Sequence, residues 1–205
     1  MHTVTTATAD ELPAVTRVLG EAFADDPVIV GMVGGGHGRQ DRATYLFTAL
    51  LRAELHRGVV VDVARDDEGA VLGAAVWERP DAPGARLPEL VGEARTFLRA
   101  LGVTGVPRAL AGRTALSRYR PAWPHWYLGQ IGVAASARGT GVGSSLLEHR
   151  LRTVDDSRVG AYLESSTERN RALYRRFGFE PQGEIPGVPA ARPVAMWREP
   201  VGVSV

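Results

Sequence analysis

Apolar residues near the N-terminus recur at helical spacing and predict two helices. The first follows Thr8 to Glu11, which have the spacing of a capping box, after a short N-terminal strand; it ends at Asp25-Asp-Pro27. Its apolar positions are Leu12, Val15, Val18, Leu19, Ala22 and Phe23. A loose apolar and glycine-rich segment is expected from Val28 to Gly38. The second helix is predicted over residues 40–57, with Gly58 as its stop.

The residues after the second predicted helix have the pattern of β-strands. Residues 59–64 and 70–77 are predicted to form a hairpin closed by Asp66-Asp-Glu-Gly69. The pattern changes at residues 80–124, where we expect a helical insertion with one helix ending near Leu101 and another starting at Pro107. The remaining predicted elements are a strand at 127–133, a helix to about 154, a strand at 161–165, a helix at 168–177 and strands near 179–182 and 192–197. This order predicts a mixed α/β fold.

Composition narrows the possible functions. With 205 residues, 44% of them hydrophobic, the chain is long enough for one well-buried domain over residues 1–205 and short for two. All 24 basic residues are arginine and face 23 acidic residues, so a net charge of +1 does not indicate a nucleic-acid surface. The absence of lysine and cysteine excludes Schiff-base and thiol nucleophiles and disulfides.

The N-terminal pattern and the histidines add three expectations. The first residues lack the charged start and apolar core of a signal peptide, and no apolar run approaches membrane-spanning length. We therefore expect a cytoplasmic protein that does not bind membranes. The five histidines share no ligand spacing, which argues against a metal site.

The most informative segment is a strand that runs into a glycine-rich turn and then a helix. The strand Tyr127–Val133 precedes Arg138-Gly-Thr-Gly-Val-Gly-Ser144, which opens the helical pattern. Such a turn directs unpaired backbone N–H groups and the helix dipole at one point, which favours a bound phosphate. Glycine after a strand can also be purely geometric. A dinucleotide-binding turn would need glycine or alanine where Ser144 stands, and an acidic residue about 20 positions on.

Two motifs resemble those of the GNAT superfamily of N-acetyltransferases. Arg138-Gly-Thr-Gly-Val-Gly143 fits its Q/R-x-x-G-x-G/A signature, and Leu163 to Phe179 resembles its second landmark, a strand, a helix-starting asparagine and a tyrosine before Gly-Phe. The layout with its long insertion is similar to the puromycin N-acetyltransferases and their actinobacterial relatives. The resemblance implies a mostly antiparallel mixed sheet of about six to seven strands, flanked by helices and splayed at the central strand.

The resemblance also implies acetyl-CoA as cosubstrate and assigns residues to it. The strand residues Ile131, Gly132 and Val133 would line the pantetheine arm. Asn170 would bond the cofactor near its pantetheine, or is simply a first-turn helix residue. The residues implied for the pyrophosphate are Arg138, Gly139, Thr140, Gly141, Val142, Gly143 and Ser144. None of positions 139–144 is proline, so each offers a backbone donor.

Acetyl transfer to an amine needs a base, a stabilised oxyanion and a partner for the departing thiolate. By the resemblance, Tyr174 is the candidate leaving-group donor, although it could instead belong to the packing stripe of its helix. Glu164 is a candidate base or a structural carboxylate. Asp26 and Glu78 are candidate contacts to a cationic acceptor. Asp26 stands where the puromycin enzyme carries tyrosine, which argues against puromycin as the acceptor.

The sequence hypothesis is therefore an acetyl-CoA-dependent N-acetyltransferase that acts on a primary amine of a small molecule by direct attack in a ternary complex. The absence of cysteine agrees with a reaction without an acyl-enzyme. Two alternatives stay open: a non-catalytic acyl-CoA-binding regulatory or interaction module, and an acetyltransferase that acts on protein N-termini. Homodimerisation follows only from the resemblance to the family.

Overall fold

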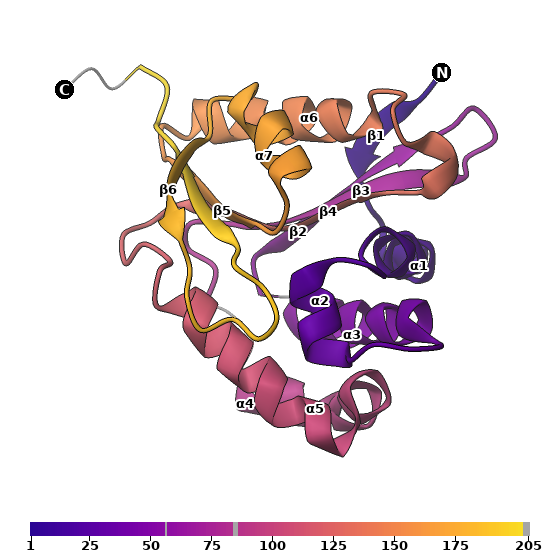
Figure 1. The fold of residues 1–205 in the computed structure, drawn as a ribbon. Helices are drawn as coiled ribbons and strands as arrows, with labels where there is room; N and C mark the ends of the chain where they lie inside the picture. Colours follow the sequence, from indigo (N-terminus) through magenta and orange to yellow (C-terminus); the bar gives the residue numbers. More distant parts are fainter. Residues whose placement is uncertain (56, 84–85, 203–205) are drawn as a thin grey trace.

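A single mixed sheet organises the chain (Figure 1). The computed structural model describes residues 1–55, 57–83 and 86–202; His56, which the sequence places in the second helix, and positions 84–85 of the expected insertion lie outside the described residues. The seven strands are β1 (Thr3–Thr6), β2 (Val59–Arg65), β3 (Val71–Glu78), β4 (Trp126–Val133), β5 (Ala161–Ser165), β6 (Glu180–Glu184) and β7 (Val194–Arg198). They lie in the order β1-β2-β3-β4-β5-β7-β6. Only β4 and β5 are parallel neighbours.

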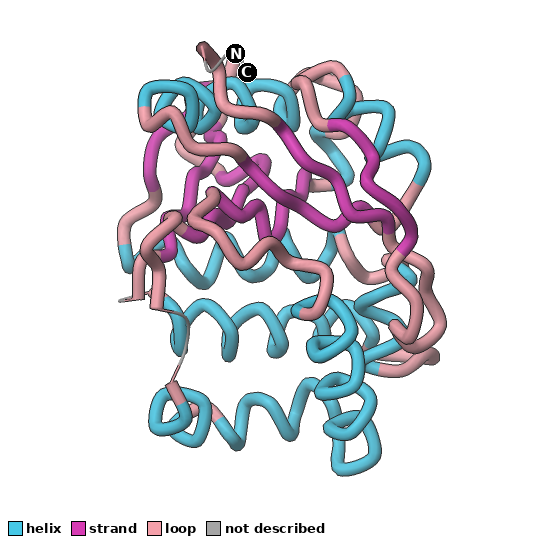
Figure 2. The backbone as a smooth tube through the Cα atoms, turned by 90° about the vertical axis from the view of Figure 1, so that its left-hand side faces the viewer, coloured by secondary structure: helices cyan, strands magenta, loops and turns pink. Residues whose placement is uncertain are grey.

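Helices cover both faces of this sheet (Figure 1). They are α1 (Leu12–Ala22), α2 (Pro27–Val33), α3 (Arg39–Glu54), α4 (Leu87–Gly92), α5 (Ala94–Ser117), α6 (Val142–Asp156) and α7 (Glu168–Arg175). Helices α6 and α7 lie on one face and α1, α2 and α3 on the other, with α4 and α5 as a further layer outside α3 (Figure 2). The expected mixed sheet flanked by helices is confirmed. No described helix is long and apolar enough to cross a membrane.

The structure corrects the predicted helices in three places. Residues 28–38 were expected to be irregular, but most of this segment forms α2, because Asp26 caps the N–H groups of Val28 and Ile29 at 3.0 and 3.2 Å. The β-branched residues of this short helix concealed it. Helix α3 ends at Glu54 rather than near residue 57. The first predicted insertion helix is divided into α4 and the first part of α5, and the expected break before the second lies at Gly102, where the backbone leaves helical geometry with φ of 61°.

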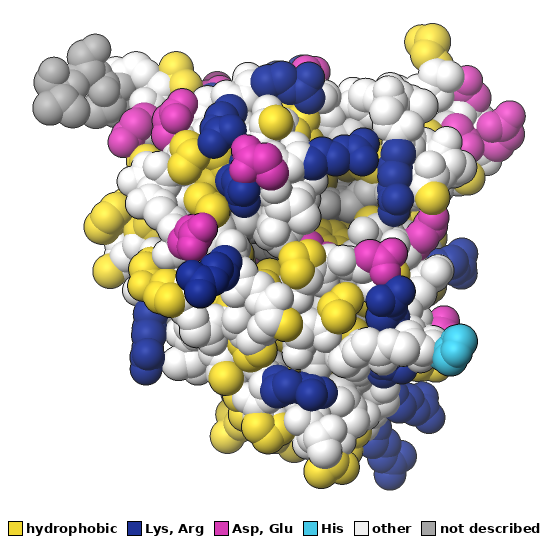
Figure 3. Space-filling model, in the orientation of Figure 1, with side chains coloured by type: hydrophobic (Ala, Val, Ile, Leu, Met, Phe, Trp, Pro, Cys, Tyr) yellow, Lys and Arg dark blue, Asp and Glu magenta, His cyan; other side chains and the backbone are white. Residues whose placement is uncertain are grey.

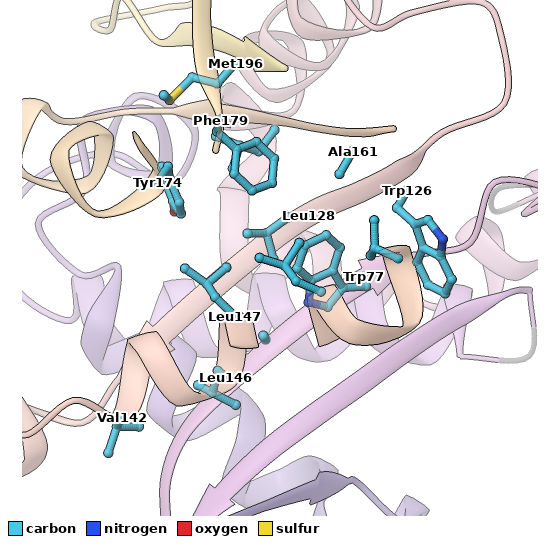
Figure 4. Close-up of a cluster of buried hydrophobic side chains, with 14 of the residues drawn as sticks. Trp77, Trp126, Leu128, Val142, Leu146, Leu147, Ala161, Tyr174, Phe179 and Met196 are labelled. Atoms are coloured by element: carbon cyan, nitrogen blue, oxygen red, sulfur yellow. The ribbon is translucent and has the colours of Figure 1, made fainter. Parts of the chain in front are cut away.

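The sheet has an apolar cluster on each face. Under α6, buried residues from five strands pack with Leu146 and Leu147, and Trp77 and Trp126 belong to this cluster (Figure 4). On the opposite face, α1 and α3 bury Leu19 and Phe47 against β2 and β3. This burial on both faces explains why the sequences of the central strands are nearly continuous apolar runs.

A buried ion pair fastens α6 to the sheet. Asp62 on β2 is 0% exposed and Arg150 on α6 is 7% exposed. The guanidinium donates to both carboxylate oxygens, and the Nε to Oδ2 distance is 2.8 Å. The Thr6 hydroxyl also donates to Asp62, at 3.4 Å. Because the carboxylate lies away from water, its charge is compensated mainly by this one guanidinium.

Replacing Arg150 with methionine is expected to lower the free energy of unfolding by about 3–5 kcal/mol, because it leaves the Asp62 carboxylate buried without its partner. Urea denaturation followed by circular dichroism measures the change. The control is Arg152→Met on the same helix, an exposed position where we expect a change below about 0.5 kcal/mol. Equal effects of the two substitutions would contradict this account of the ion pair.

Candidate active site

The central strands β4 and β5 separate after a short parallel contact. They pair only over Trp126–Leu128 with Ala161–Leu163, whereas β4 continues beside β3 as far as Val133. The edge of β4 that faces β5 therefore has no strand partner over residues 129–133. Main-chain groups along such an edge are free to pair with an extended ligand that carries amides. The splay expected from the sequence is present, and Ile131, Gly132 and Val133 lie along it.

Gly132 has a packing reason to lack a side chain. A Cβ at this position would lie 2.8 Å from the Cβ of Ala22 and 3.1 Å from a methyl carbon of Leu19. Both neighbours belong to α1, which crosses β4 at this point. The glycine therefore lets α1 sit directly against the strand whose other edge is open.

The glycine turn at the end of β4 is open to solvent. Gly139 and Gly141 have φ values of 81° and 90°, a region that favours glycine, and a Cβ added at either would meet no atom within 4 Å. Gly141 is also the N-cap of α6. The space around both residues leaves room for a ligand to approach the main chain.

Most backbone donors of the turn are unused. The N–H groups of Arg138 and Thr140 point back to the carbonyls of Ala135 and Ala137, each at 3.4 Å. Within the described residues, no such backbone bond involves the N–H groups of residues 141–144, which open α6. The Thr140 hydroxyl donates to Ala137 at 2.7 Å, and the exposed Arg138 makes no ion pair with a described residue. These donors and the helix dipole suit an anion.

Helix α7 carries two of the predicted residues, Asn170 and Tyr174. Its N-cap Thr167 accepts a hydrogen bond from the backbone N–H of Asn170 at 3.3 Å. The side-chain amide of the half-buried Asn170 has no hydrogen-bond partner among the described residues. Tyr174 is 6% exposed and packs edge-on against Phe179, at the margin of the α6 cluster (Figure 4). Its hydroxyl has no hydrogen-bond partner in the described part of the chain. Burial, with the nearby Asp26 charge, raises the pKa of Tyr174.

Asp26 is held by its own chain. One carboxylate oxygen caps α2, and the other accepts a hydrogen bond from the Ser166 hydroxyl in the loop between β5 and α7. Burial raises the pKa of Asp26. Both oxygens already have partners, and Asp26 lies beside Tyr174 rather than beside Glu78, so a contact between Asp26 and the acceptor stays a prediction.

A second polar group lies on the sheet face that α3 and α5 cover. We call it the acid–tyrosine cluster; it consists of Glu54, Glu78, Tyr127, Tyr162 and Glu164. Glu78, Tyr127 and Tyr162 are in register across β3, β4 and β5, and Glu164 follows two residues after Tyr162 on the same face. The Tyr127 hydroxyl donates to the Glu164 carboxylate at 2.7 Å. The two tyrosine rings stack, with centroids 6.1 Å apart.

Arg120, in the segment after α5, neutralises part of this cluster. It donates to Glu78 at 2.7 Å and to the Nε2 atom of His125 at 3.2 Å, and its guanidinium lies 4.0 Å from the centre of the Tyr127 ring. His125 bonds the Trp123 carbonyl through Nδ1 at 2.7 Å. Burial lowers the pKa of His125, so the neutral ring, with Nε2 as acceptor, fits these contacts.

The carboxylates of the cluster are only partly compensated. Burial raises the pKa of Glu164 to about 7, although the Tyr127 hydrogen bond and Arg120 act in the opposite direction. Burial and the neighbouring Glu78 raise the pKa of Glu54 to about 7 as well. Carboxyl groups with such pKa values exchange protons near neutral pH, which is what a general base requires.

The predicted site residues thus fall into adjoining groups. Glu78 and Glu164 belong to the acid–tyrosine cluster; Tyr174, Asn170 and Asp26 gather around α7; the glycine turn closes the open edge of β4. The sequence analysis missed Glu54, Arg120, Tyr127 and Tyr162. Period-two spacing puts Tyr162 on the face of Glu164 and could have found it. Arg120 comes from an irregular segment, for which the pattern held no signal.

The surface is hollowed between the α6–α7 side and the α1–α2 side (Figure 3). A separate pocket of about 550 Å³ lies at the other end of α6, between Asp155, Arg176 and Arg198, away from the glycine turn. No group of three or more histidine, aspartate or glutamate residues in the described chain could hold a metal ion. An open strand edge that leads to a glycine turn at a helix N-terminus is suited to an extended, phosphate-bearing ligand.

Comparison with known proteins identifies the family. Residues 56–181 match the family described as acetyltransferase (GNAT) domain. A solved structure from Corynebacterium glutamicum, described as histone acetyltransferase HPA2 and related acetyltransferase, is 34% identical with a TM-score of 0.76, covering 100% of this chain and 99% of that chain. The chain belongs to the GNAT acetyltransferase family.

Two further comparisons are more distant. An uncharacterised N-acetyltransferase of Schizosaccharomyces pombe is 27% identical over 190 residues, which are 86% of this chain and 74% of the yeast protein. The structure of a GNAT family acetyltransferase from Brucella melitensis in complex with acetyl-CoA is 16% identical with a TM-score of 0.54, and covers 100% of this chain and 91% of that chain. The last comparison shows likeness of fold alone.

The raised pKa of Glu164 predicts a pH dependence of stability. Between about pH 4.5 and pH 7 the folded chain holds a proton on Glu164 that the unfolded chain has lost, so the free energy of unfolding should fall as the pH rises through this range. Glu164→Gln should reduce that fall by about 1–2 kcal/mol. Urea denaturation at pH 5 and pH 7.5 measures it, with the exposed Glu68→Gln as control. Parallel pH profiles for native chain and Glu164→Gln would refute the assignment.

Proposed function

We propose that the chain is an acetyl-CoA-dependent N-acetyltransferase that acetylates a primary amine of a small molecule. The observation that carries the proposal is the open edge of β4, which runs directly into the unoccupied backbone donors at the start of α6. Pantetheine is an extended chain with amides, and pyrophosphate is an anion, so one continuous surface offers partners to both. The family membership and the acetyl-CoA complex of the Brucella melitensis acetyltransferase support the same ligand.

Individual residues follow from this placement. The main chain of Ile131, Gly132 and Val133 would pair with the pantetheine amides. The N–H groups of residues 141–144 would bind the pyrophosphate, with Arg138 adding positive charge at the exposed rim. The free Asn170 amide would bind near the pantetheine. Thr140 contributes least, because its hydroxyl and its N–H both bond within the turn.

The chemistry of the amine calls for a base. A primary amine with a pKa of about 10.4 is neutral in only about one molecule in 2,500 at pH 7. Glu164, whose pKa is raised to about 7, would accept the proton directly or through water. The neutral nitrogen would then attack the thioester carbonyl carbon; the N–C bond forms, the C–S bond breaks, the nitrogen gives its second proton to water, and coenzyme A leaves as its thiolate.

Tyr174 would donate a hydrogen bond to that thiolate. Its raised pKa makes complete proton transfer to sulfur less favourable than for an ordinary phenol. We therefore give it the role of a hydrogen-bond donor that stabilises the developing negative charge, after which the thiolate takes a proton from water. The unpartnered hydroxyl on α7 is in keeping with this role.

The cofactor site can be tested by putting bulk and negative charge into the turn. Gly141→Glu should abolish the micromolar binding of acetyl-CoA and free coenzyme A that we expect for the native chain, measured by isothermal titration calorimetry. Gly69→Glu is the matched control, because Gly69 also has a positive φ, of 86°, and open surroundings but lies in the β2–β3 turn. Absence of binding by the folded native chain would overturn the proposed function.

Tyr174→Phe removes only the hydroxyl from its helix. We expect acetyl-CoA affinity to stay within twofold and turnover of a primary amine to fall at least tenfold, because the thiolate loses its hydrogen-bond donor. A thiol-release assay over a panel of primary amines measures turnover, and Tyr45→Phe at an exposed position is the control. Unchanged turnover in Tyr174→Phe would remove the proposed role while leaving the cofactor site intact.

A further inference from the structure

The acid–tyrosine cluster holds more negative charge than its own chain balances. It has three carboxylates on or against one sheet face, and Arg120 is directly paired with only one of them, Glu78. Arg113, an exposed residue of α5, lowers the pKa of Glu54 through its charge but forms no ion pair with it. Neutral His125 adds no charge. Glu54 and Glu164 are therefore left without a bonded cation among the described residues.

A buried hydroxyl points to an absent partner at the same place. Tyr162 is 2% exposed, and its hydroxyl has no well-aligned hydrogen-bond partner among the described residues, although the Glu164 carboxylate is near enough to raise its pKa together with burial. Buried polar groups of native proteins are nearly always paired, so an unpaired one calls for an explanation. A ligand N–H group directed at the Tyr162 oxygen, beside the Glu164 carboxylate, would supply the partner.

The walls of the cluster already bind a cation. The Arg120 guanidinium lies over the Tyr127 ring, which shows that this face accommodates positive charge by cation–π contact. Glu78 and Glu164 stand on strands two apart in the sheet, with the Tyr127 ring between them, and Glu54 reaches the same region from the end of α3. Carboxylates therefore flank an aromatic floor from two directions. Such a layout suits an elongated ligand with a positive charge at each end.

We propose that the acceptor is a small diamine: Glu164 and Tyr162 receive the amine that is acetylated, and Glu54 binds the second, charged amine. This inference rests on the proposed function and gives its substrate class. The raised pKa values of Glu54 and Glu164 agree with it, because carboxylates without a cation keep protons that a bound dication displaces.

The substrate preference is the first test. In a thiol-release assay at pH 7.5, 1,4-diaminobutane should have a kcat/KM at least tenfold above that of 1-aminobutane, with 1,3-diaminopropane and 1,5-diaminopentane giving the preferred length. Glu54→Gln should reduce this diamine-to-monoamine ratio at least fivefold, since it removes one carboxylate with little change of shape. Glu68→Gln, on the exposed β2–β3 turn, should leave the ratio unchanged.

The second test does not depend on turnover. Titration of the native chain with 1,4-diaminobutane at pH 7, in two buffers of different ionisation enthalpy, should show protons released on binding, and Glu54→Gln should release fewer. Acetylation of monoamines without a diamine preference would overturn this inference and leave the function standing. Diamine binding with proton release, but no acetyl transfer to any amine, would overturn the function and keep the dication site. Binding without proton release would overturn the dication site.

Discussion

The early separation of β4 from β5 is the constraint on which the rest of the site depends. A parallel pair that stays together for three residues and then opens leaves hydrogen-bonding groups exposed in the middle of a sheet, where they would otherwise be paired. The molecule keeps this gap because each strand has a second neighbour: β4 is held along its length by β3, and β5 by β7. Stability comes from the outer pairings, and the inner edges are free for ligand.

The two sides of that gap carry polar groups of different kinds. On the α6 side the glycine turn and α7 present donors, in keeping with an anionic ligand. On the α3 side the sheet presents carboxylates and tyrosines, in keeping with a cationic one. The family membership accounts for the first side. The second side is built partly from the segment after α5, which adds Arg120 and His125 to residues of the sheet.

Periodic elements were predictable and irregular ones were not. Five strands, β2, β3, β4, β5 and β7, and the helices α1, α3, α6 and α7 follow from residue spacing, since each has buried positions, whereas the short edge strands β1 and β6 have none. Helix α2 was missed because its stability comes from the Asp26 cap and Pro27 rather than from its residues' propensity. The glycine turn could be predicted from the sequence because residues adjacent in the chain form it. The acid–tyrosine cluster joins positions 54, 78, 127, 162 and 164; apart from the spacing of 162 and 164 on one strand, its long-range contacts leave no local pattern.

The Asp26 carboxylate binds two different segments at the mouth of the cleft. Asp26 begins α2 and also binds Ser166, so a single side chain couples the start of a helix on one face to the loop that leads into α7 on the other. A displacement of the loop would pull on the helix, and unwinding of the helix would release the loop. The two rims of the cleft are therefore joined through one side chain, although they belong to opposite faces of the sheet.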